Sequence, residues 1–227
     1  MKKNHEDNGK STGNRRIYLF GRLEGEVALP LIKKLLRLSE RDPSRPIELY
    51  INSSGGNGYN ADAIIATMQA ISAPVNTICL GHALSGACEI LASGTGVRQA
   101  YEFSTLMFHQ TLWEADGDIT NLEIQAAQGQ RFREAQIELL HRCTGQDRKK
   151  LRKDIERDFY LSAHEAVKYG LIDRVITHKD RRRQNLADRT IRSASDLAMQ
   201  ASLGSTARAN VVRPYTAARS RIAVKKV

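Results

Sequence analysis

Residues 47–71 read IELYINSSGGNGYNADAIIATMQAI, and this stretch decides the fold class. It begins with a short apolar run at residues 47–51, which is typical of a buried strand. A glycine-rich turn follows at residues 53–58, and apolar residues then recur at helical spacing: Ala61, Ile64, Ile65, Met68 and Ile71. A strand, a tight turn and an amphipathic helix in succession indicate one unit of an α/β fold.

The same alternation continues on both sides of this unit. We predict further strands at residues 17–20, 75–80, 101–108 and 174–177, and further helices at residues 27–38, 85–92, 120–141 and 162–169. The last helix has a full set of end signals, with Ser162 as N-cap, Glu165 in the capping-box position and Gly170 after its end. Strands and helices in alternation predict one α/β domain with a largely parallel sheet.

Composition excludes several classes of protein. The 227 residues are 41% hydrophobic and 26% charged, which is an ordinary balance for a folded, soluble chain. No apolar run approaches the ~18 to 20 residues that span a bilayer, and the opening MKKNHEDNGKST lacks the apolar core of a secretory signal. We therefore expect no membrane anchor and a cytoplasmic location. Three widely spaced cysteines fit neither a disulfide framework nor a zinc knuckle, so Cys79 and Cys88 are expected to be buried small hydrophobes and no metal site is predicted.

The net charge of +10 is concentrated in one tail. Residues 179–227 hold 12 basic and 3 acidic side chains, whereas residues 1–178 are almost neutral. We predict a polar N-terminal tail at residues 1–15, a folded domain at residues 16–178 and a disordered basic tail at residues 179–227. The tail is either a solvated extension or a segment that binds nucleic acid or an acidic partner. The body has no basic pattern, so a nucleic-acid-binding function for the whole protein is not supported.

Three segments of the body could carry chemistry, and each has a structural alternative. Paired glycines at residues 52–58 can bring backbone N–H groups to an anion, but such turns often serve only to reverse the chain. Ser85 ends a strand-to-helix turn, where it is either a nucleophile or an ordinary N-cap, and His82 is equally ambiguous. His109 follows the carboxyl end of an apolar strand, and active sites of open α/β sheets lie at that end of the strands. A lone histidine there is nevertheless usually structural. Asp158 is either a site residue or a surface acid.

Taken together, these segments resemble one family. The motifs INSSGG, TICLGHALSGA, LMFHQ, CTGQ and ERDFYLSAHEAVKYGLID occur in this order in ClpP, the proteolytic subunit of the ATP-dependent Clp protease. The resemblance covers residues 16–177. It implies a ClpP/crotonase-like fold of repeated β-β-α units, with a protruding strand-helix handle at about residues 111–143.

The resemblance also implies roles for single residues. Ser85 would be the nucleophile, His109 the general base and Asp158 the residue that orients the histidine. The backbone N–H groups of Gly56 and Gly86 would form the oxyanion hole. The implied enzyme is a serine endopeptidase that cleaves unfolded polypeptides inside homo- or hetero-heptameric rings stacked as a tetradecamer. An AAA+ unfoldase would use the ATP, so no cofactor is expected in this chain.

The sequence departs from the family pattern at several positions. Ser54 replaces the usual proline of the glycine-rich turn, and Gly86 replaces the usual methionine after the nucleophile. Glu48 stands where the family commonly has an aromatic residue in the pocket that docks the unfoldase. A carboxylate is costly to bury in an apolar pocket, so the usual contact is not expected to carry over unchanged.

Other functions fit parts of the same pattern. A catalytically idle ring subunit would share the fold but would generally lack one of the three catalytic residues. An acyl-CoA hydratase or isomerase would use the two backbone donors without needing Ser85, His109 and Asp158 together. A related processing protease would share the chemistry and differ in its partner.

Overall fold

The structure, a computed structural model, describes residues 14–180 of the chain. Of the two tails predicted from the sequence, only residues 14, 15, 179 and 180 fall within this range, so the tails stay predictions. Arg15 differs from a tail residue: its side chain is buried and donates to backbone carbonyls at the end of the first helix.

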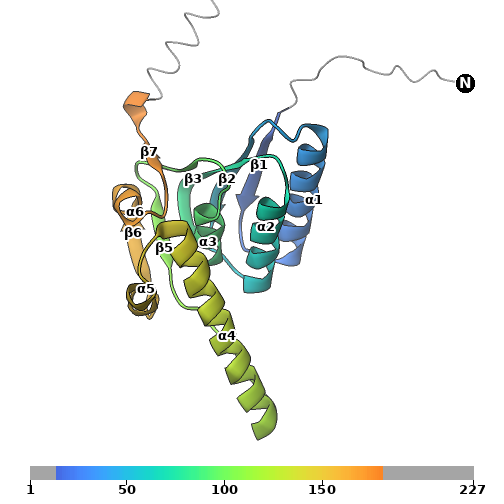
Figure 1. The fold of residues 1–227 in the computed structure, drawn as a ribbon, viewed down its shortest axis with the longest axis vertical. Helices are drawn as coiled ribbons and strands as arrows, with labels where there is room; N and C mark the ends of the chain where they lie inside the picture. The colour runs from blue at the N-terminus through green and yellow to red at the C-terminus, as the bar shows by residue number, and fades with distance from the viewer. Residues whose placement is uncertain (1–13, 181–227) are drawn as a thin grey trace, which may run out of the picture. The chain divides into compact units, whose positions relative to one another are not determined.

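The order of elements along the chain confirms an α/β fold (Figure 1). The elements are β1 (Arg16–Phe20), α1 (Gly25–Arg41), β2 (Ile47–Ser53), α2 (Gly58–Ala70), β3 (Val75–Leu84), α3 (Gly86–Ala92), β4 (Arg98–Tyr101), β5 (Thr105–Phe108), α4 (Ile119–Thr144), α5 (Arg148–Asp154), β6 (Phe159–Ser162), α6 (Ala163–Tyr169) and β7 (Arg174–Ile176).

The strands form one sheet in the order β1-β2-β3-β4-β7, with β5 paired to β3 and β6 paired to β5. All pairs are parallel except β5 with β6, which is antiparallel. The predicted largely parallel sheet is therefore confirmed. The inner strand β2 alternates fully buried with half-buried residues, because helices cover one of its faces.

Strands change partners along their length, and this produces the β-β-α repeat. The first half of β3 pairs with β4, and its last residues, from His82 to Leu84, pair with β5. The register of β2 against β3 likewise shifts after Ile51, and beyond it Leu23 forms an isolated bridge with Gly56. Each long strand is thus two segments, and the second segments gather where the glycine-rich turn and Ser85 lie.

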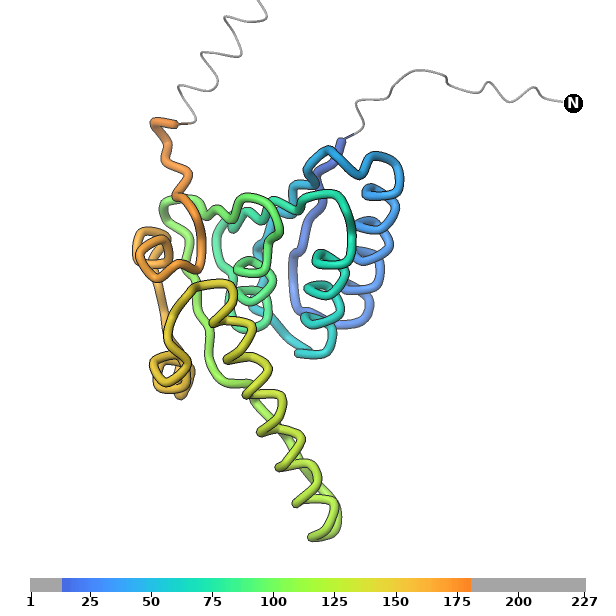
Figure 2. Tube along the Cα trace, in the orientation of Figure 1, coloured from blue at the N-terminus to red at the C-terminus, as the bar shows by residue number. Residues whose placement is uncertain are grey.

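Helices α1, α2 and α3 lie side by side in the views of Figures 1 and 2, and neighbouring helices are in contact. Their apolar faces and the inner strands supply most of the core. The largest fully buried side chains are Phe108, Ile17, Leu19, Leu23, Leu35, Ile47, Leu49, Ile51, Ile64, Met68, Ile90 and Leu91.

Helix α4 protrudes from this body (Figures 1 and 2). Of its 26 residues, Gln136, Ile137 and Leu140 are the fully buried ones, and all three lie in its second half. The chain before it runs alongside, because Gln125 donates to the Asp116 carbonyl at 2.8 Å and the Trp113 ring packs on Gly129. This pair of segments corresponds to the predicted handle, although residues 109–116 form no strand ladder within the described chain.

One prediction of secondary structure was wrong in detail, and two elements were missed. The single strand predicted at residues 101–108 is two strands, β4 and β5, separated by a turn in which Ser104 donates to the carbonyls of Cys79 and Leu80. Helix α5 and strand β6 were not predicted at all. Helix α5 reads RKKLRKD and buries only Leu151, so it has no amphipathic pattern to detect.

Candidate active site

Ser85 sits at the sharp turn between β3 and α3. Its backbone has φ 53° and ψ −131°, and it is the only non-glycine residue with positive φ among residues 14–180. A residue with a Cβ in this conformation costs on the order of 1–3 kcal/mol, and such strain clusters at functional sites. The serine occupies the N-cap position of α3, yet its side chain makes no capping hydrogen bond. Ser85 is therefore the N-cap by position, as one alternative held, but its side chain does not cap the helix.

The sheet register brings a histidine to this serine. The Ser85 N–H donates to the Met107 carbonyl at 2.8 Å, which continues the parallel pairing of β3 with β5. His109 is the first residue after β5, and its Nε2 lies 2.9 Å from Ser85 Oγ. The hydroxyl is thus hydrogen-bonded to an imidazole, the arrangement that activates a serine.

The antiparallel pair β5–β6 brings the aspartate to the histidine. Phe108 pairs with Phe159, so the residues just outside this pair, His109 and Asp158, face each other. The distance from His109 Nδ1 to Asp158 Oδ1 is 3.1 Å. Sequence reasoning missed β6, the strand that produces this contact, and assigned Asp158 from motif resemblance alone.

The exposures of the three side chains differ. Ser85 is half-buried, the His109 side chain is 17% exposed and that of Asp158 is 54% exposed. A carboxylate so open to water adds little to stability through its ion pair. In this geometry the carboxylate can hold the Nδ1–H tautomer, in which Nε2 is the acceptor that faces the Ser85 hydroxyl.

The two predicted oxyanion donors border the same cavity as Ser85. Leu23 forms backbone hydrogen bonds with the residues on either side of Gly56. Its N–H donates to the Gly55 carbonyl at 2.9 Å, and its carbonyl accepts from the Asn57 N–H at 3.1 Å. In this parallel bridge the N–H of Gly56 itself is not used by Leu23 and points to the opposite side. Gly86 begins α3, where backbone N–H groups have no intrahelical acceptor.

Close packing explains the glycines around Ser85. A Cβ added to Gly55 would lie 2.6 Å from the Leu84 carbonyl oxygen and 2.9 Å from Ser85 Cβ. A Cβ on Gly86 would lie 3.1 Å from Ala61 Cβ. The turn at residues 53–58 therefore lies directly against the serine, which a simple chain reversal would not require.

The cavity that contains Ser85 and His109 has a volume of about 680 Å³. It runs between the glycine-rich turn, the start of α3 and the handle, with Trp113 and Phe132 contributed by the handle. Two buried polar atoms on its lining have no hydrogen-bond partner within residues 14–180: Trp113 Nε1 and Gln136 Oε1.

Two residues of this cavity were missed from the sequence. Glu89 lies one turn after Ser85 on α3 and is buried, and burial raises the pKa of its carboxyl to about 7. Gln136 of α4 donates from Nε2 to Glu89 Oε1 at 2.5 Å and to the His109 carbonyl at 2.8 Å. The signal was present in the sequence of α3, GACEILA, where a single charged residue interrupts a run of small and apolar residues.

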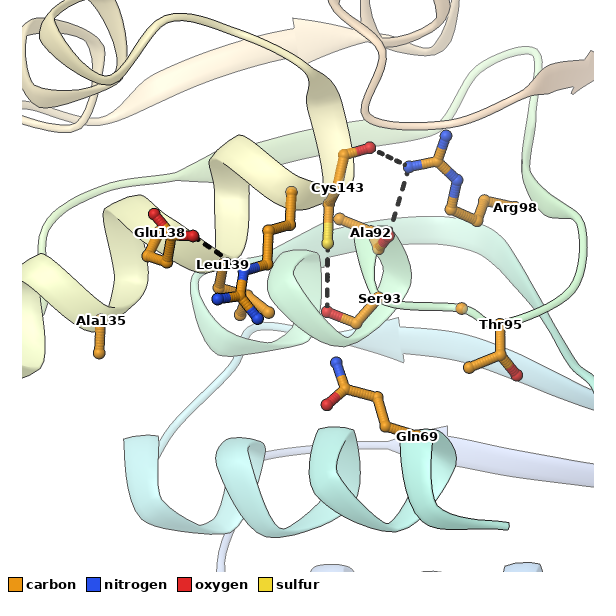
Figure 3. A pocket seen from close by; sticks show the side chains of 11 residues that line it. Gln69, Ala92, Ser93, Thr95, Arg98, Ala135, Glu138, Leu139 and Cys143 are labelled. Carbon is orange, nitrogen blue, oxygen red and sulfur yellow. Dashed lines mark hydrogen bonds and ion pairs between the residues drawn. The ribbon is translucent and has the colours of Figure 1, made fainter. Parts of the chain in front are cut away.

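A second cavity, of about 520 Å³, lies at the other end of α3 (Figure 3). Several of its polar groups are hydrogen-bonded to one another: Cys143 Sγ lies 3.7 Å from Ser93 Oγ, and Arg98 donates to the carbonyls of Ala92 and Cys143. Burial raises the pKa of the Cys143 thiol, so it is not held as a reactive thiolate. This cavity has no activated nucleophile.

The remaining candidates do not join the site. His82 lies within β3 and does not line the Ser85 cavity. Cys79 and Cys88 are buried, as predicted, and burial raises the pKa of Cys79 to about 11. Across residues 14–180, no three His, Cys, Asp or Glu side chains gather as a metal site would require. In the same range, no helix is long and apolar enough to cross a bilayer.

The sequence also matches known proteins. A sequence model of the Clp protease family matches residues 3–179. The ATP-dependent Clp protease proteolytic subunit of Deinococcus radiodurans is 38% identical to this chain over 173 residues, which cover 76% of this chain and 83% of that protein.

Proposed function

The chain belongs to the Clp protease family, a family of serine endopeptidases, and we propose that it cleaves peptide bonds with Ser85, His109 and Asp158 as its catalytic triad. One observation carries the proposal: a serine in a strained turn is hydrogen-bonded to a histidine, which in turn contacts a carboxylate. Among residues 14–180, no other serine side chain is hydrogen-bonded to an imidazole.

In the proposed mechanism Ser85 Oγ attacks the scissile carbonyl carbon while His109 Nε2 takes the hydroxyl proton. Asp158 stabilises the resulting imidazolium and keeps its orientation. The oxyanion of the tetrahedral intermediate accepts hydrogen bonds from the N–H groups of Gly56 and Gly86, and losing such a donor typically costs ~3 to 4 kcal/mol. As the C–N bond breaks, His109 returns the proton to the leaving amine. Water then hydrolyses the acyl-enzyme by the same steps.

The backbone around Gly56 is proposed to hold the substrate. Leu23 is hydrogen-bonded to the backbone on one side of this segment, so the other side of Gly56 faces the cavity. A peptide in extended conformation can add to such an edge as a further strand, with its carbonyl delivered to Ser85. Unfolded polypeptide is the form of substrate that meets this requirement.

We further propose that the subunit works in heptameric rings, stacked in pairs, with an AAA+ unfoldase as partner. The relative from Deinococcus radiodurans is named as a subunit of an ATP-dependent protease. Glu48 supports an altered docking contact, because its carboxylate is 40% exposed, pairs with Arg16 at 3.1 Å and accepts from the Tyr50 hydroxyl at 3.2 Å. The cysteines of the chain are free thiols, which supports a reducing compartment, the cytoplasm.

Labelling by a fluorophosphonate probe tests the triad. The wild-type protein should label, because only an activated serine reacts quickly, and Ser85→Ala and His109→Ala should not. Asp158→Asn should fold normally and label slowly, because an asparagine favours the wrong histidine tautomer; an equivalent change in a serine protease lowers kcat by about 10⁴. No labelling of assembled wild-type protein would contradict the proposal and favour a catalytically idle ring subunit.

A further inference from the structure

Glu89 is placed to meet a substrate side chain. It lies four residues after Ser85, or about 6 Å along the helix axis, and helical side chains tilt toward the N-terminus of their helix. Its carboxyl group therefore lies on the Ser85 side of the helix, and it lines the same cavity as Ser85 and His109. The residue is only 6% exposed, so this carboxyl belongs to the floor of the cavity and not to its rim.

The floor lacks hydrogen-bond donors. Gln136 Nε2 is the one donor to Glu89 in the described chain, and the same nitrogen also serves the His109 carbonyl. Gln136 Oε1, on a residue that is 5% exposed, has no donor at all within residues 14–180. Buried carboxylates and amides are normally paired, so an amide oxygen with no donor, beside a carboxylate with a single shared donor, leaves room for donors from outside the chain.

The charges around the cavity are mostly negative, which also favours a positively charged donor. Arg22 is engaged by Glu24 at 3.5 Å, both at the exposed entrance. The other carboxylates of the lining, Glu89 and Glu114, have no ion-pair partner among residues 14–180. Asp62 on α2 adds a further negative charge near Glu89 and raises the pKa of that carboxyl, after burial as the larger cause. A cation would relieve all of these costs.

We propose that Glu89 and Gln136 form the floor of the pocket for the residue on the acyl side of the scissile bond, and that they select lysine or arginine there. This rests on the proposed function of Ser85. A long basic side chain would run its CH₂ stem past Met107 and Phe132, which line the cavity, and place its charged end on the floor. Its N–H groups would donate to the Glu89 carboxylate and to Gln136 Oε1 together.

Two fluorogenic peptides that differ only in the residue before the scissile bond test this proposal. One carries lysine and the other norleucine, which has a similar apolar stem and no amine. The ratio of their kcat/KM values should favour lysine in the wild type. It should fall by about 100-fold in Glu89→Gln and in Glu89→Leu, because a site built for a polar group discriminates strongly only while its own polar groups are present. Glu40→Gln, an exposed change outside the cavity, should leave the ratio unchanged.

Fluorophosphonate labelling of the same preparations separates the two proposals. If the wild type labels at Ser85 and prefers norleucine, or if its lysine preference survives in both Glu89 variants, the assignment of the pocket is overturned while the triad stands. If the wild type does not label, the proposed function fails, and this inference fails with it. If labelling persists in Glu89→Leu while the preference moves to norleucine, the pocket is assigned, since a misfolded variant would lose both.

Discussion

Glu89 makes folding depend on pH in a direction opposite to that of a salt-bridged acid. Burial raises the pKa of its carboxyl from 4.5 to about 7. Between these two pH values the folded chain keeps a proton that the unfolded chain has lost. Raising the pH through this window therefore weakens folding, by on the order of 3 kcal/mol in total, and above about pH 7 this group causes no further loss.

The variant Glu89→Gln should remove this dependence. Glutamine keeps an acceptor for Gln136 but carries no charge, so the variant should gain stability over wild type at pH 8 and little at pH 5. Urea unfolding followed by the fluorescence of Trp113, at one protein concentration, measures the difference. Glu40→Gln, at an exposed position, is the control. A Glu89→Gln effect of equal size at both pH values would contradict the assignment.

Gly55 and Gly21 form a matched pair for the packing around Ser85. Both have φ near +80°, but a Cβ at Gly55 would strike the Leu84 carbonyl and Ser85, whereas a Cβ at Gly21 would meet nothing within 4 Å. Gly21→Ala should therefore cost about 1 kcal/mol from backbone strain and keep fluorophosphonate labelling. Gly55→Ala should cost at least about 2 kcal/mol more and abolish labelling of the folded protein. Equal behaviour of the two variants would show that the turn does not position Ser85.

For single residues, the sequence predicted which side chains belong to the site better than it predicted which of them are in contact. Ser85 and His109 are 24 positions apart, and no local pattern distinguishes the serine from an N-cap. The structure distinguishes them by a positive φ and by the absence of a capping bond. Glu89 was missed because its role depends on Gln136, which lies 47 positions away on another helix.

At the scale of the elements, the C-terminal end of α1 is stabilised by Arg15, which precedes β1 in the sequence. The buried Arg15 guanidinium donates to the carbonyls of Leu38, Asp42, Arg45 and Pro46. These acceptors include a carbonyl of the last turn of α1, where a cation also favours the helix dipole. Burial lowers the pKa of Arg15, yet the side chain stays charged because arginine titrates far above neutrality.

The variants Arg15→Ala and Arg16→Ala should differ sharply although the residues are neighbours. Arg15→Ala leaves several carbonyls without a donor and should lower the free energy of unfolding by about 2–3 kcal/mol. The side chain of Arg16 is 60% exposed in its pair with Glu48, so Arg16→Ala should cost less than about 0.5 kcal/mol. Chemical denaturation of both variants measures this. A similar loss in the two would mean that Arg15 is not the anchor of α1.

Helices with an apolar face were predictable from the sequence, and short elements were not. The α6 boundary is confirmed because the Ser162–Glu165 capping box and Gly170 act locally. Strand β6 has only four residues with a single buried one, Leu161, so no alternation can develop. The site nevertheless depends on β6, because its register with β5 brings Asp158 to His109. Long-range pairing of this kind leaves no local signal.

Over the whole domain, apolar surface is left uncovered on the handle. Leu112, Ile119 and Ile124 are 79%, 77% and 61% exposed, and all lie on the protruding segments at residues 109–132. Exposed apolar residues of this kind mark an interface, and we propose that the handles meet there between the two stacked rings. The handle also contributes Trp113 and Phe132 to the Ser85 cavity, so an interface there would fix the walls of the proposed substrate pocket.

Replacing Leu112, Ile119 and Ile124 together by serine should separate stacked rings. The tetradecamer proposed here should become a heptamer in size-exclusion chromatography with light scattering, because the variant removes the apolar area that holds the handles together. Phe103→Ser is the matched control, since Phe103 is 93% exposed but lies outside the handle. It should leave the mass unchanged.

Fluorophosphonate labelling should also fall in the triple variant as the tetradecamer is lost, because the handle that carries Trp113 and Phe132 would no longer be held in place. A tetradecamer that survives the triple substitution would mean that the handle is not the contact between rings.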